Sequence, residues 1–323
     1  MALAPQFQEI PLNAVDWQDH SFRFSPSADP IRLADSLKEV GLLAPPWLRE
    51  KGGESYQVIT GWKRLLAAAQ LGWKSVPALI LPAGTPESSC LLVIIHDNAL
   101  GRGFNPLEQA LLAARLLAHW DRDTVAQRFL PLLGLPPTPG YLERLLSASV
   151  LEAPWQTLLA QGSLALTAAA RLAKWPGPER EAALPFWEQL PLSQSKQEEF
   201  LEALELLARR EGSTPARILY RPEIEQCLTQ PDLTPQERAG AVRRLLKGWL
   251  LPRLSAVEET FQAGLKRLGL SQHPRLRLKP PPAFEGPDFQ MEIKFRDAAE
   301  LRQLLAELAR LAGEEEFSDL TAL

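Results

Sequence analysis

Gly61, Lys63 and Arg64 stand where an apolar strand pattern, YQVIT, gives way to a helical one, LLAAAQ. Backbone N–H groups at a helix N-terminus have no partner within the helix and carry partial positive charge, and a glycine lets the backbone approach a ligand closely. Two cations at this point predict an anion site. The same residues also fit a turn glycine followed by two solvated side chains.

A second group of basic residues lies near the C-terminus. In RLRLK (275–279) and FQMEIKF (289–295), apolar and polar residues alternate, so each predicted strand has one apolar and one wet face. The wet faces carry four cations and one carboxylate: Arg275, Arg277, Lys279, Lys294 and Glu292. If the protein binds DNA, such a face is expected to contact phosphates without reading sequence, and the binding is expected to weaken with salt. The alternative is a solvated strand face that keeps a sheet edge soluble.

The composition of the chain is sufficient to build hydrophobic cores for the elements that position these residues. Of its 323 residues, 46% are hydrophobic and 23% are charged, which indicates a globular protein of two or three domains. The formal net charge is −4, so no global basic field recruits nucleic acid. Any DNA contact must therefore come from a local patch.

Cysteine and histidine usage gives no sign of a metal site. Cys90 and Cys227 form no CxxC pair, and the four histidines are scattered without ligand spacing. The N-terminus has no basic segment typical of a signal peptide, and apolar runs such as CLLVII are too short to span a bilayer. We expect a reduced, metal-free cytoplasmic protein without membrane insertion.

The first hundred residues mix helix and strand signals. Residues 31–40 have apolar residues at helical spacing and stop at Gly41, while PWLRE, YQVIT and VPALIL read as short strands. The pattern predicts a small α/β domain over residues 1–100.

The middle of the chain, from about 105 to 230, is almost wholly helical in pattern. Asn105 can cap a helix, Pro106 suits its first position, and Glu108 completes a capping box. Further on, RFLPLLGLPPTPGYLERLLSAS predicts a helix, a Gly/Pro turn and a second helix. This pair fits an ordinary helical hairpin or a DNA-reading helix-turn-helix.

The third region opens at a second capping box, with Thr234 as the cap, Pro235 and Glu237. It ends with the two alternating strands and a helix whose leucines repeat at a and d positions: Leu301, Leu304, Leu308 and Leu311, with Leu305 beside them. A ββα unit of this size is marginal alone, so a second copy of the chain is expected to complete its core. The alternative is that the leucines pack only within their own chain.

Two boxes in this order resemble the ParB family of chromosome and plasmid partition proteins. Gly61, Lys63, Arg64 and Ala67 fall on the family's first box, a Gly-Glu-Arg-Arg motif followed by a small helix. The second box is matched by Asp97, Asn98, Asn105, Pro106 and Glu108. Residues 151–175 and the C-terminal strands and helix are also similar to family segments, with residues 177–232 the least secure.

The resemblance implies an α+β multidomain architecture. It consists of a ParB/sulfiredoxin-like nucleotide-binding domain (1–100), an all-α domain with a helix-turn-helix (101–232), and a linker helix with a ββα dimerisation domain (233–323). The implied function is that of a CTP-dependent DNA clamp in chromosome or plasmid segregation, a nucleoid-associated homodimer that loads on DNA and slides.

The resemblance also implies roles for individual residues. Gly61, Lys63 and Arg64 would meet the triphosphate of CTP, and Arg23 could add a phosphate contact. Asn98 and Asp97 would offer the oxygen ligands or the water-positioning carboxylate that Mg²⁺-triphosphate chemistry needs.

The sequence departs from the family pattern at several of these positions. Trp62 replaces the Glu of the first box, Asp97 shortens the Glu of the second, and Gly101 stands where the second box has its Arg, with Arg102 one position later. A misplaced carboxylate can cost about 10²-fold in rate, so at most a weak CTPase is expected.

The DNA-reading and partner-binding segments also differ from the family. The predicted recognition helix has one cation, Arg144, next to Glu143, although such helices use Arg, Lys, Asn or Gln against base edges. The first residues lack the basic leader through which family members engage a ParA-type ATPase, so that ATPase is only a candidate partner.

Two other classes remain open. One is a nucleotide-binding or degenerate ParB-like dimer that serves as a scaffold or regulator, without specific DNA reading or hydrolysis. The other is a sulfiredoxin-like enzyme, whose nucleophilic Cys would stand where this chain has Trp62.

Overall fold

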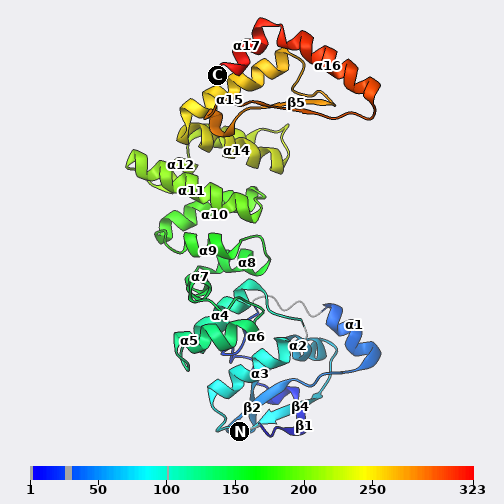
Figure 1. Ribbon diagram of the computed structural model, residues 1–323. Helices are drawn as coiled ribbons and strands as arrows, with labels where there is room; N and C mark the ends of the chain where they lie inside the picture. Colours follow the sequence, from blue (N-terminus) through cyan, green and yellow to red (C-terminus); the bar gives the residue numbers. More distant parts are fainter. Residues whose placement is uncertain (1–2, 26–30, 100–101) are drawn as a thin grey trace. The chain divides into compact units, whose positions relative to one another are not determined.

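The structure, a computed structural model, describes residues 3–25, 31–99 and 102–323. The chain divides into two compact units. The N-terminal unit consists of residues 1–184 and 193–198, and the C-terminal unit consists of residues 185–192 and 199–323. Figure 1 colours the chain by residue number, so both ranges can be followed there. The division falls within two helices, α10 (Gly177–Gln189) and α11 (Gln194–Glu211). The domain boundaries expected near residues 100 and 232 remain predictions.

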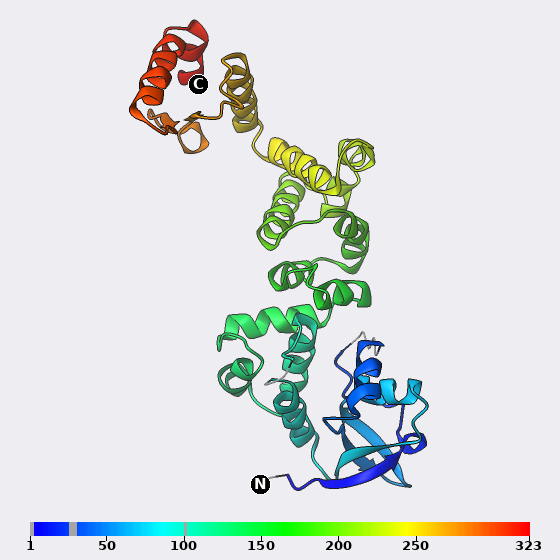
Figure 2. The ribbon, with the colours of Figure 1, turned by 90° about the vertical axis from the view of Figure 1, so that its right-hand side faces the viewer.

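The N-terminal unit begins with a four-stranded mixed sheet of order β1-β4-β2-β3. Its strands are β1 (Gln6–Pro11), β2 (Trp47–Lys51), β3 (Ser55–Thr60) and β4 (Ser75–Leu81). β1 pairs antiparallel with β4, β4 parallel with β2, and β2 antiparallel with β3. β1 and β3 are the edge strands, and β1 is drawn in dark blue in Figure 2. The sequence pattern predicted the other three strands and missed β1.

Three helices accompany the sheet: α1 (Ile31–Val40), α2 (Trp62–Gln70) and α3 (Glu87–Ala99). Alternate residues of the strands, such as Leu48, Val58 and Ile80, pack with Leu37 and Leu65 from α1 and α2 in one buried cluster. In β4 the buried residues Val76, Ala78 and Ile80 alternate with half-buried ones, as expected for a strand covered on one face. β3 is instead buried without a break from Gln57 to Thr60. α3 runs beside β3 (Figure 1), so its last turn lies near the point where β3 ends and α2 begins.

The rest of the N-terminal unit is helical: α4 (Pro106–Leu116), α5 (Arg122–Thr124), the π-helical turn η2 (Val125–Phe129), α6 (Leu130–Leu132), α7 (Pro139–Ser149), α8 (Ala153–Ala160) and α9 (Leu166–Leu172). The predicted capping box at the start of α4 is present: the Asn105 side chain accepts from the Glu108 N–H, and the Glu108 carboxylate accepts from the Asn105 N–H. The cap satisfies donors that the first helical turn leaves free.

The segment from Arg122 to Ser149 forms a helix, a turn and a helix, as its sequence pattern predicted. Gly134 closes the first helical run at φ +77°, a left-handed conformation that glycine adopts without penalty. Thr138 then caps α7 through the Tyr141 N–H.

The C-terminal unit contains the rest of α11 and five further helices: α12 (Pro215–Leu219), α13 (Pro222–Thr229), α14 (Pro235–Leu250), α15 (Pro252–Arg267) and α16 (Ala298–Ala312), followed by α17 (Glu315–Thr321). Its two strands, β5 (Leu276–Lys279) and β6 (Gln290–Ile293), pair antiparallel. The predicted capping box of Thr234 and Glu237 is present at the start of α14.

The apolar faces of β5 and β6 close a small core with α15, α16 and α17. Leu276 and Leu278 are buried there against Phe261, while Arg277 between them is exposed. Only one edge of the α16 leucine stripe, Leu304 and Leu311, is buried. Leu301 and Leu308 are half-buried, and Leu305 at the other edge is 49% exposed.

The mixed helix-and-sheet architecture predicted from the sequence is therefore confirmed. Among the residues that the structure describes, no helix combines the length and apolarity needed to cross a bilayer.

Candidate functional site

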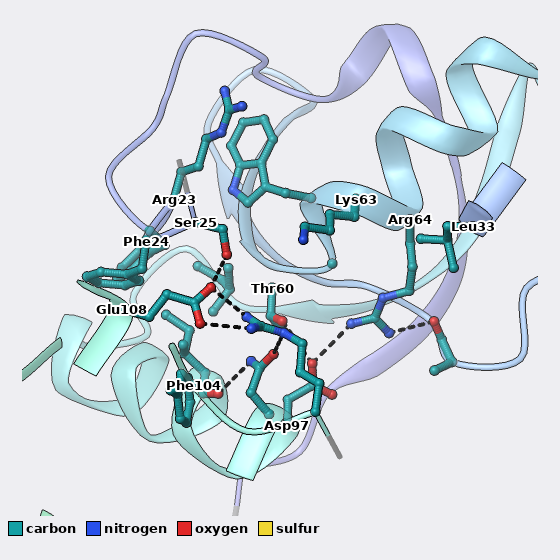
Figure 3. Close-up of a pocket in the computed structure, with 18 residues that line it drawn as sticks. Arg23, Phe24, Ser25, Leu33, Thr60, Lys63, Arg64, Asp97, Phe104 and Glu108 are labelled. Carbon is teal, nitrogen blue, oxygen red and sulfur yellow. Dashed lines mark hydrogen bonds and ion pairs between the residues drawn. The ribbon is translucent and has the colours of Figure 1, made fainter. Parts of the chain in front are cut away.

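One cavity of the N-terminal unit, about 590 Å³ in volume, lies where β3, α2 and α3 meet (Figure 3). Its size is within the ordinary range for small-molecule sites. All six residues that the sequence assigned to nucleotide or metal binding line it: Arg23, Gly61, Lys63, Arg64, Asp97 and Asn98. Residues separated by more than seventy positions in the chain thus face one space.

Gly61 makes the sharp passage from β3 into α2. It has φ +99°, a left-handed value that side chains disfavour, and it is the N-cap of α2. A Cβ at this position would lie 2.6 Å from the Pro46 Cβ, well inside van der Waals contact. Both the backbone angle and the close approach to Pro46 therefore require glycine.

The first turn of α2 presents donors to the cavity. Because Gly61 has no side chain, no side-chain cap occupies the free N–H groups of this turn. Lys63 is exposed and has no ion pair among the described residues, and its ammonium group lies at the cavity in Figure 3. This arrangement of unpaired N–H groups and one free cation suits an anion.

Arg64 is already engaged by the protein. Its guanidinium forms an ion pair with Asp97, with 3.0 Å between Nη2 and Oδ2, and donates to the Ala44 carbonyl at 2.7 Å (Figure 3). The Arg64 and Asp97 side chains are only 18% and 23% exposed, so solvent screens the pair less than a surface pair. Arg64 thus ties α2 to α3 and to the segment before β2.

Asp97 and Asn98 are held by neighbouring groups. Thr60 Oγ1 donates to the same Asp97 oxygen at 2.8 Å. The Asn98 amide donates to the Ile94 carbonyl, and its oxygen accepts from Arg102 Nε at 3.1 Å. The second oxygen of Asp97 has no hydrogen bond among the described residues.

Glu108 is the most deeply buried charged group at the cavity, with 1% of its side chain exposed. The Arg102 guanidinium donates to both of its oxygens, at 2.8 and 3.0 Å. The Ser25 hydroxyl and the Asn105 N–H donate to the same carboxylate. Burial by itself raises the pKa of a carboxyl. The donated hydrogen bonds, led by that from Arg102, outweigh burial and lower the pKa of Glu108 below its ordinary value.

Arg23 stacks on an aromatic ring of the cavity wall. Its guanidinium carbon is 5.5 Å from the centre of the Trp62 ring, within cation–π distance. Arg23 is half-buried and forms no ion pair among the described residues, so it is available to an anion at the rim.

The sequence assigned no site role to several residues that the cavity brings in: Thr60, Trp62, Arg102 and Glu108. The sequence indicated Glu108 as part of a helix cap and Arg102 as a residue one position after the Arg of the family's second box. It did not indicate that the two side chains contact each other, because that contact depends on the loop between α3 and α4. Gly101, at the position of the family's Arg, lies outside the described residues.

A Mg²⁺ ion would fit this cavity only as the partner of a bound triphosphate. The described residues contain no group of three or more acidic, His or Cys side chains able to cage a metal. Asp97 has one oxygen to offer, and Asn98 has one that Arg102 now occupies. Mg²⁺ usually takes one or two protein carboxylates together with substrate phosphates, so this donor set is sufficient.

The residues assigned to DNA lie elsewhere. Arg144 is exposed on α7 and has no ion pair within the part of the chain that the structure describes. At the C-terminal strands, Glu292 lies 2.7 Å from Lys279 and 3.7 Å from Lys294, and Glu300 pairs with Arg275 at 3.1 Å. The strand face is therefore more neutralised than the sequence alone indicated, because α16 supplies Glu300.

The first comparison with known proteins concerns the N-terminal domain. Residues 4–95 match the family model described as the ParB N-terminal domain, which spans the sheet, α1, α2 and most of α3. Residues 4–95 therefore form a ParB N-terminal domain.

Named relatives match about a third of the chain. A probable plasmid-partitioning protein ParB of Thermus thermophilus is 33% identical over 116 residues, 36% of this chain and 37% of the relative. A nucleoid occlusion protein of Geobacillus kaustophilus is 30% identical over 98 residues, 30% of this chain and 34% of the relative. The chain thus matches little more than a third of the length of these relatives.

A solved structure of a C-terminally truncated chromosome-partitioning protein ParB from Caulobacter crescentus, complexed with CTP-gamma-S, also aligns. It is 23% identical and covers 57% of this chain and 99% of that chain, with a TM-score of 0.26. A score this low does not establish a shared arrangement of the whole chain.

We predict that Glu108→Gln lowers the free energy of unfolding by about 1–3 kcal/mol at neutral pH, because a buried charge-assisted network is lost. The folded-state pKa of Glu108 is lowered, so its stabilisation is present above the unfolded value near 4.3 and disappears as the pH falls through the folded value. The difference in free energy of unfolding between wild type and variant should therefore be smaller in acid. Urea unfolding at about pH 7 and pH 3 measures this difference.

Glu237→Gln is the matched control, because Glu237 is also the acidic member of a capping box but is exposed. Glu237→Gln should lower the free energy of unfolding by less than Glu108→Gln does at neutral pH. An equal loss in both variants, or a gap that does not change with pH, would contradict the assigned role of the Glu108 network.

Proposed function

We propose that this chain is a ParB-type partition protein that binds a nucleotide, CTP with Mg²⁺, in the cavity at Gly61, and that it acts on DNA as a nucleoid-associated homodimeric clamp. The observation that carries the proposal is the convergence of the α2 N-terminus, Lys63, Arg64 and Asp97 on one cavity in a ParB N-terminal domain. The relatives' names, which concern plasmid partitioning and nucleoid occlusion, support a role in segregation.

Phosphate binding follows from the charges at the cavity. Lys63 and the free N–H groups of α2 offer donors without first breaking an interaction. Arg64 could add a second charge-assisted contact, but it would have to share or exchange its bond to Asp97. Binding of a triphosphate would therefore weaken the Arg64–Asp97 ion pair that links α2 to α3.

The choice of cytosine and the clamp mechanism rest on the resemblance of the two boxes to the ParB family. The base must lie away from the phosphate end, where Phe22, Phe24 and Phe104 supply apolar wall. The triphosphate would hold Mg²⁺, with Asp97 as the nearest carboxylate able to contribute an oxygen.

A specific observation favours the second candidate, a nucleotide-binding dimeric scaffold or regulator without hydrolysis. Arg64 and Thr60 both donate to Oδ2 of Asp97, the carboxylate assigned to positioning a water molecule. A carboxylate neutralised in this way is a poor base for a water molecule. Binding as a switch, with at most weak turnover, is the form of the proposal that this geometry favours.

Dimerisation is proposed through residues 270–312. The apolar stripe of α16 is wider than the face its own core covers, since Leu304 and Leu311 are buried while Leu305 is exposed. Phe295, just after β6, is 51% exposed as well. A second copy of the same stripe is the partner whose shape and chemistry match, as in a symmetric helix pair.

DNA contact is proposed at two places, α7 through Arg144 and the C-terminal strands through Arg277 and its neighbours. Arg277 is the exposed member of that face without an ion pair among the described residues, although Glu292 lies near it. A dimer would double the face. Such contacts bind phosphates without reading sequence and weaken with salt.

We predict that Lys63→Ala weakens CTP binding at least tenfold without a loss of stability, because Lys63 is exposed and unpaired. Arg64→Ala should abolish binding and also destabilise the unit, since it breaks the link to Asp97. Asp97→Ala should impair turnover more than binding. Calorimetric titration of CTP, ATP, GTP and UTP, with and without Mg²⁺, measures these effects.

Lys38→Ala is the matched control, because Lys38 is an exposed lysine on α1 that does not line the cavity. Equal affinity for all four nucleotides, or CTP affinity unchanged in Arg64→Ala, would rule out the proposed pocket.

We predict that Leu305→Asp produces monomers, because a charge would stand in the exposed part of the α16 stripe without disturbing the buried Leu304. Light scattering after size exclusion should show a halved mass. Leu43→Asp, at a leucine that is 80% exposed in the N-terminal unit, should leave the mass unchanged. A wild-type protein that is monomeric at micromolar concentration would refute this interface.

We predict DNA binding that is largely non-specific, with log K falling by about 0.9 per neutralised phosphate for each log unit of salt. Changing Arg275, Arg277 and Lys279 together to Glu should abolish it, while Arg144→Ala has the smaller effect. Fluorescence anisotropy at two salt concentrations tests this. Tight, salt-insensitive binding to one sequence that survives the triple change would instead assign DNA reading to α7.

A further inference from the structure

The Trp62 side chain carries a polar group without a partner in the part of the chain that the structure describes. The residue is 9% exposed, and its indole Nε1 atom is buried without a hydrogen-bond partner among residues 3–25, 31–99 and 102–323. A buried donor without a partner costs free energy, and native proteins keep few of them. Its presence at the candidate site therefore requires an explanation.

The position of Trp62 connects this donor with the cavity. Trp62 is the first residue of α2, directly before Lys63, and its side chain lines the cavity. Three neighbours fix the ring: Arg23 lies over its face, and His20 and Trp17 meet it edge-on at 5.5 and 6.2 Å between ring centres. The donor is thus held rigidly beside the first turn of α2.

The fold itself needs the ring but not its nitrogen. Trp62 belongs to the buried cluster between the sheet and helices α1 and α2, where its contribution is apolar area and aromatic contact. A phenylalanine could supply much of that contribution. The indole N–H adds only a desolvation cost in the free protein, so its benefit must appear when something else is bound.

We infer that the Trp62 indole N–H donates a hydrogen bond to an oxygen of the nucleotide bound in the cavity. This inference rests on the proposed function. The indole nitrogen is a donor only, so its partner is an oxygen with a lone pair, on a phosphate, the ribose or the base, and never a metal ion. Trp62 then contributes to affinity without adding charge to a site that already holds several ionised groups.

Shielding of the Nε1 atom from water sets a condition on this contact. Because less than 1 Å² of the atom is accessible in the free protein, ligand entry must displace the side chains that cover it or turn the ring slightly. Arg23, stacked on the ring, is the neighbour most able to move, since it is half-buried and long. Hydrogen bonding at Trp62 is thereby coupled to repositioning of Arg23.

The decisive comparison is Trp62→Phe with Trp17→Phe in the full-length protein. Both variants lose one indole N–H from the same aromatic cluster, but the Trp17 Nε1 donates to the Leu12 carbonyl at 3.1 Å. For Trp62→Phe we expect the dissociation constant for CTP to rise about tenfold, with no loss of thermal stability beyond that of Trp17→Phe. For Trp17→Phe we expect lower stability and unchanged CTP affinity.

Calorimetry with CTP, CDP, CMP and cytidine identifies the accepting oxygen. A tenfold loss that appears with CTP and vanishes with cytidine assigns it to a phosphate, and a loss that persists with cytidine assigns it to the sugar or base. The indole proton resonance of Trp62, identified by its absence in Trp62→Phe, should also move downfield when nucleotide is added to the wild type.

Two results would overturn the inference but leave the proposed function standing. If the wild type binds CTP and Trp62→Phe binds it equally well, the indole N–H has no role in binding, while the proposed function stands. If Trp62→Phe loses more stability than Trp17→Phe in the absence of ligand, the N–H is already satisfied in the free protein. Failure of the wild type to bind any nucleotide would remove the proposed function and this inference together.

Discussion

The candidate site depends on one backbone constraint, the left-handed glycine that turns β3 into α2. At Gly61 the chain passes so close to Pro46 that no side chain fits, and φ of +99° suits glycine alone. This turn sets the first turn of α2, whose N–H groups have no partner within the helix, at the cavity together with Lys63 and Arg64. The sheet order, which puts β2 next to both β3 and β4, holds Pro46 in place against it.

Two intramolecular ion pairs determine the electrostatics of the cavity. Arg64 is bound to Asp97 and Arg102 to Glu108, so the two arginines link α3 to its neighbours before any ligand arrives. Lys63 and Arg23 are left to meet an anion. The site therefore combines fixed, partly buried ion pairs with a smaller number of available cations, and ligand binding must compete with the first set.

Local sequence patterns were reliable where a single element determines the outcome. The capping boxes of Asn105 with Glu108 and of Thr234 with Glu237, the alternation around Leu276 and Leu278, and three of the four sheet strands all followed from short-range chemistry. β1 was missed because QFQEIP has little apolar alternation, and its place at the sheet edge comes from pairing with β4.

The sequence by itself determined which residues could form an anion site, since Gly61, Lys63 and Arg64 lie together on one strand-to-helix passage, and it determined the ParB resemblance through the order of two boxes. It could not decide which cations are free. That depends on Asp97 meeting Arg64, on Glu108 meeting Arg102 and on Glu300 meeting Arg275, all contacts between different elements. Only the tertiary structure decided these pairings, because ionic and hydrogen-bond partners are set by distance in space rather than by separation along the chain.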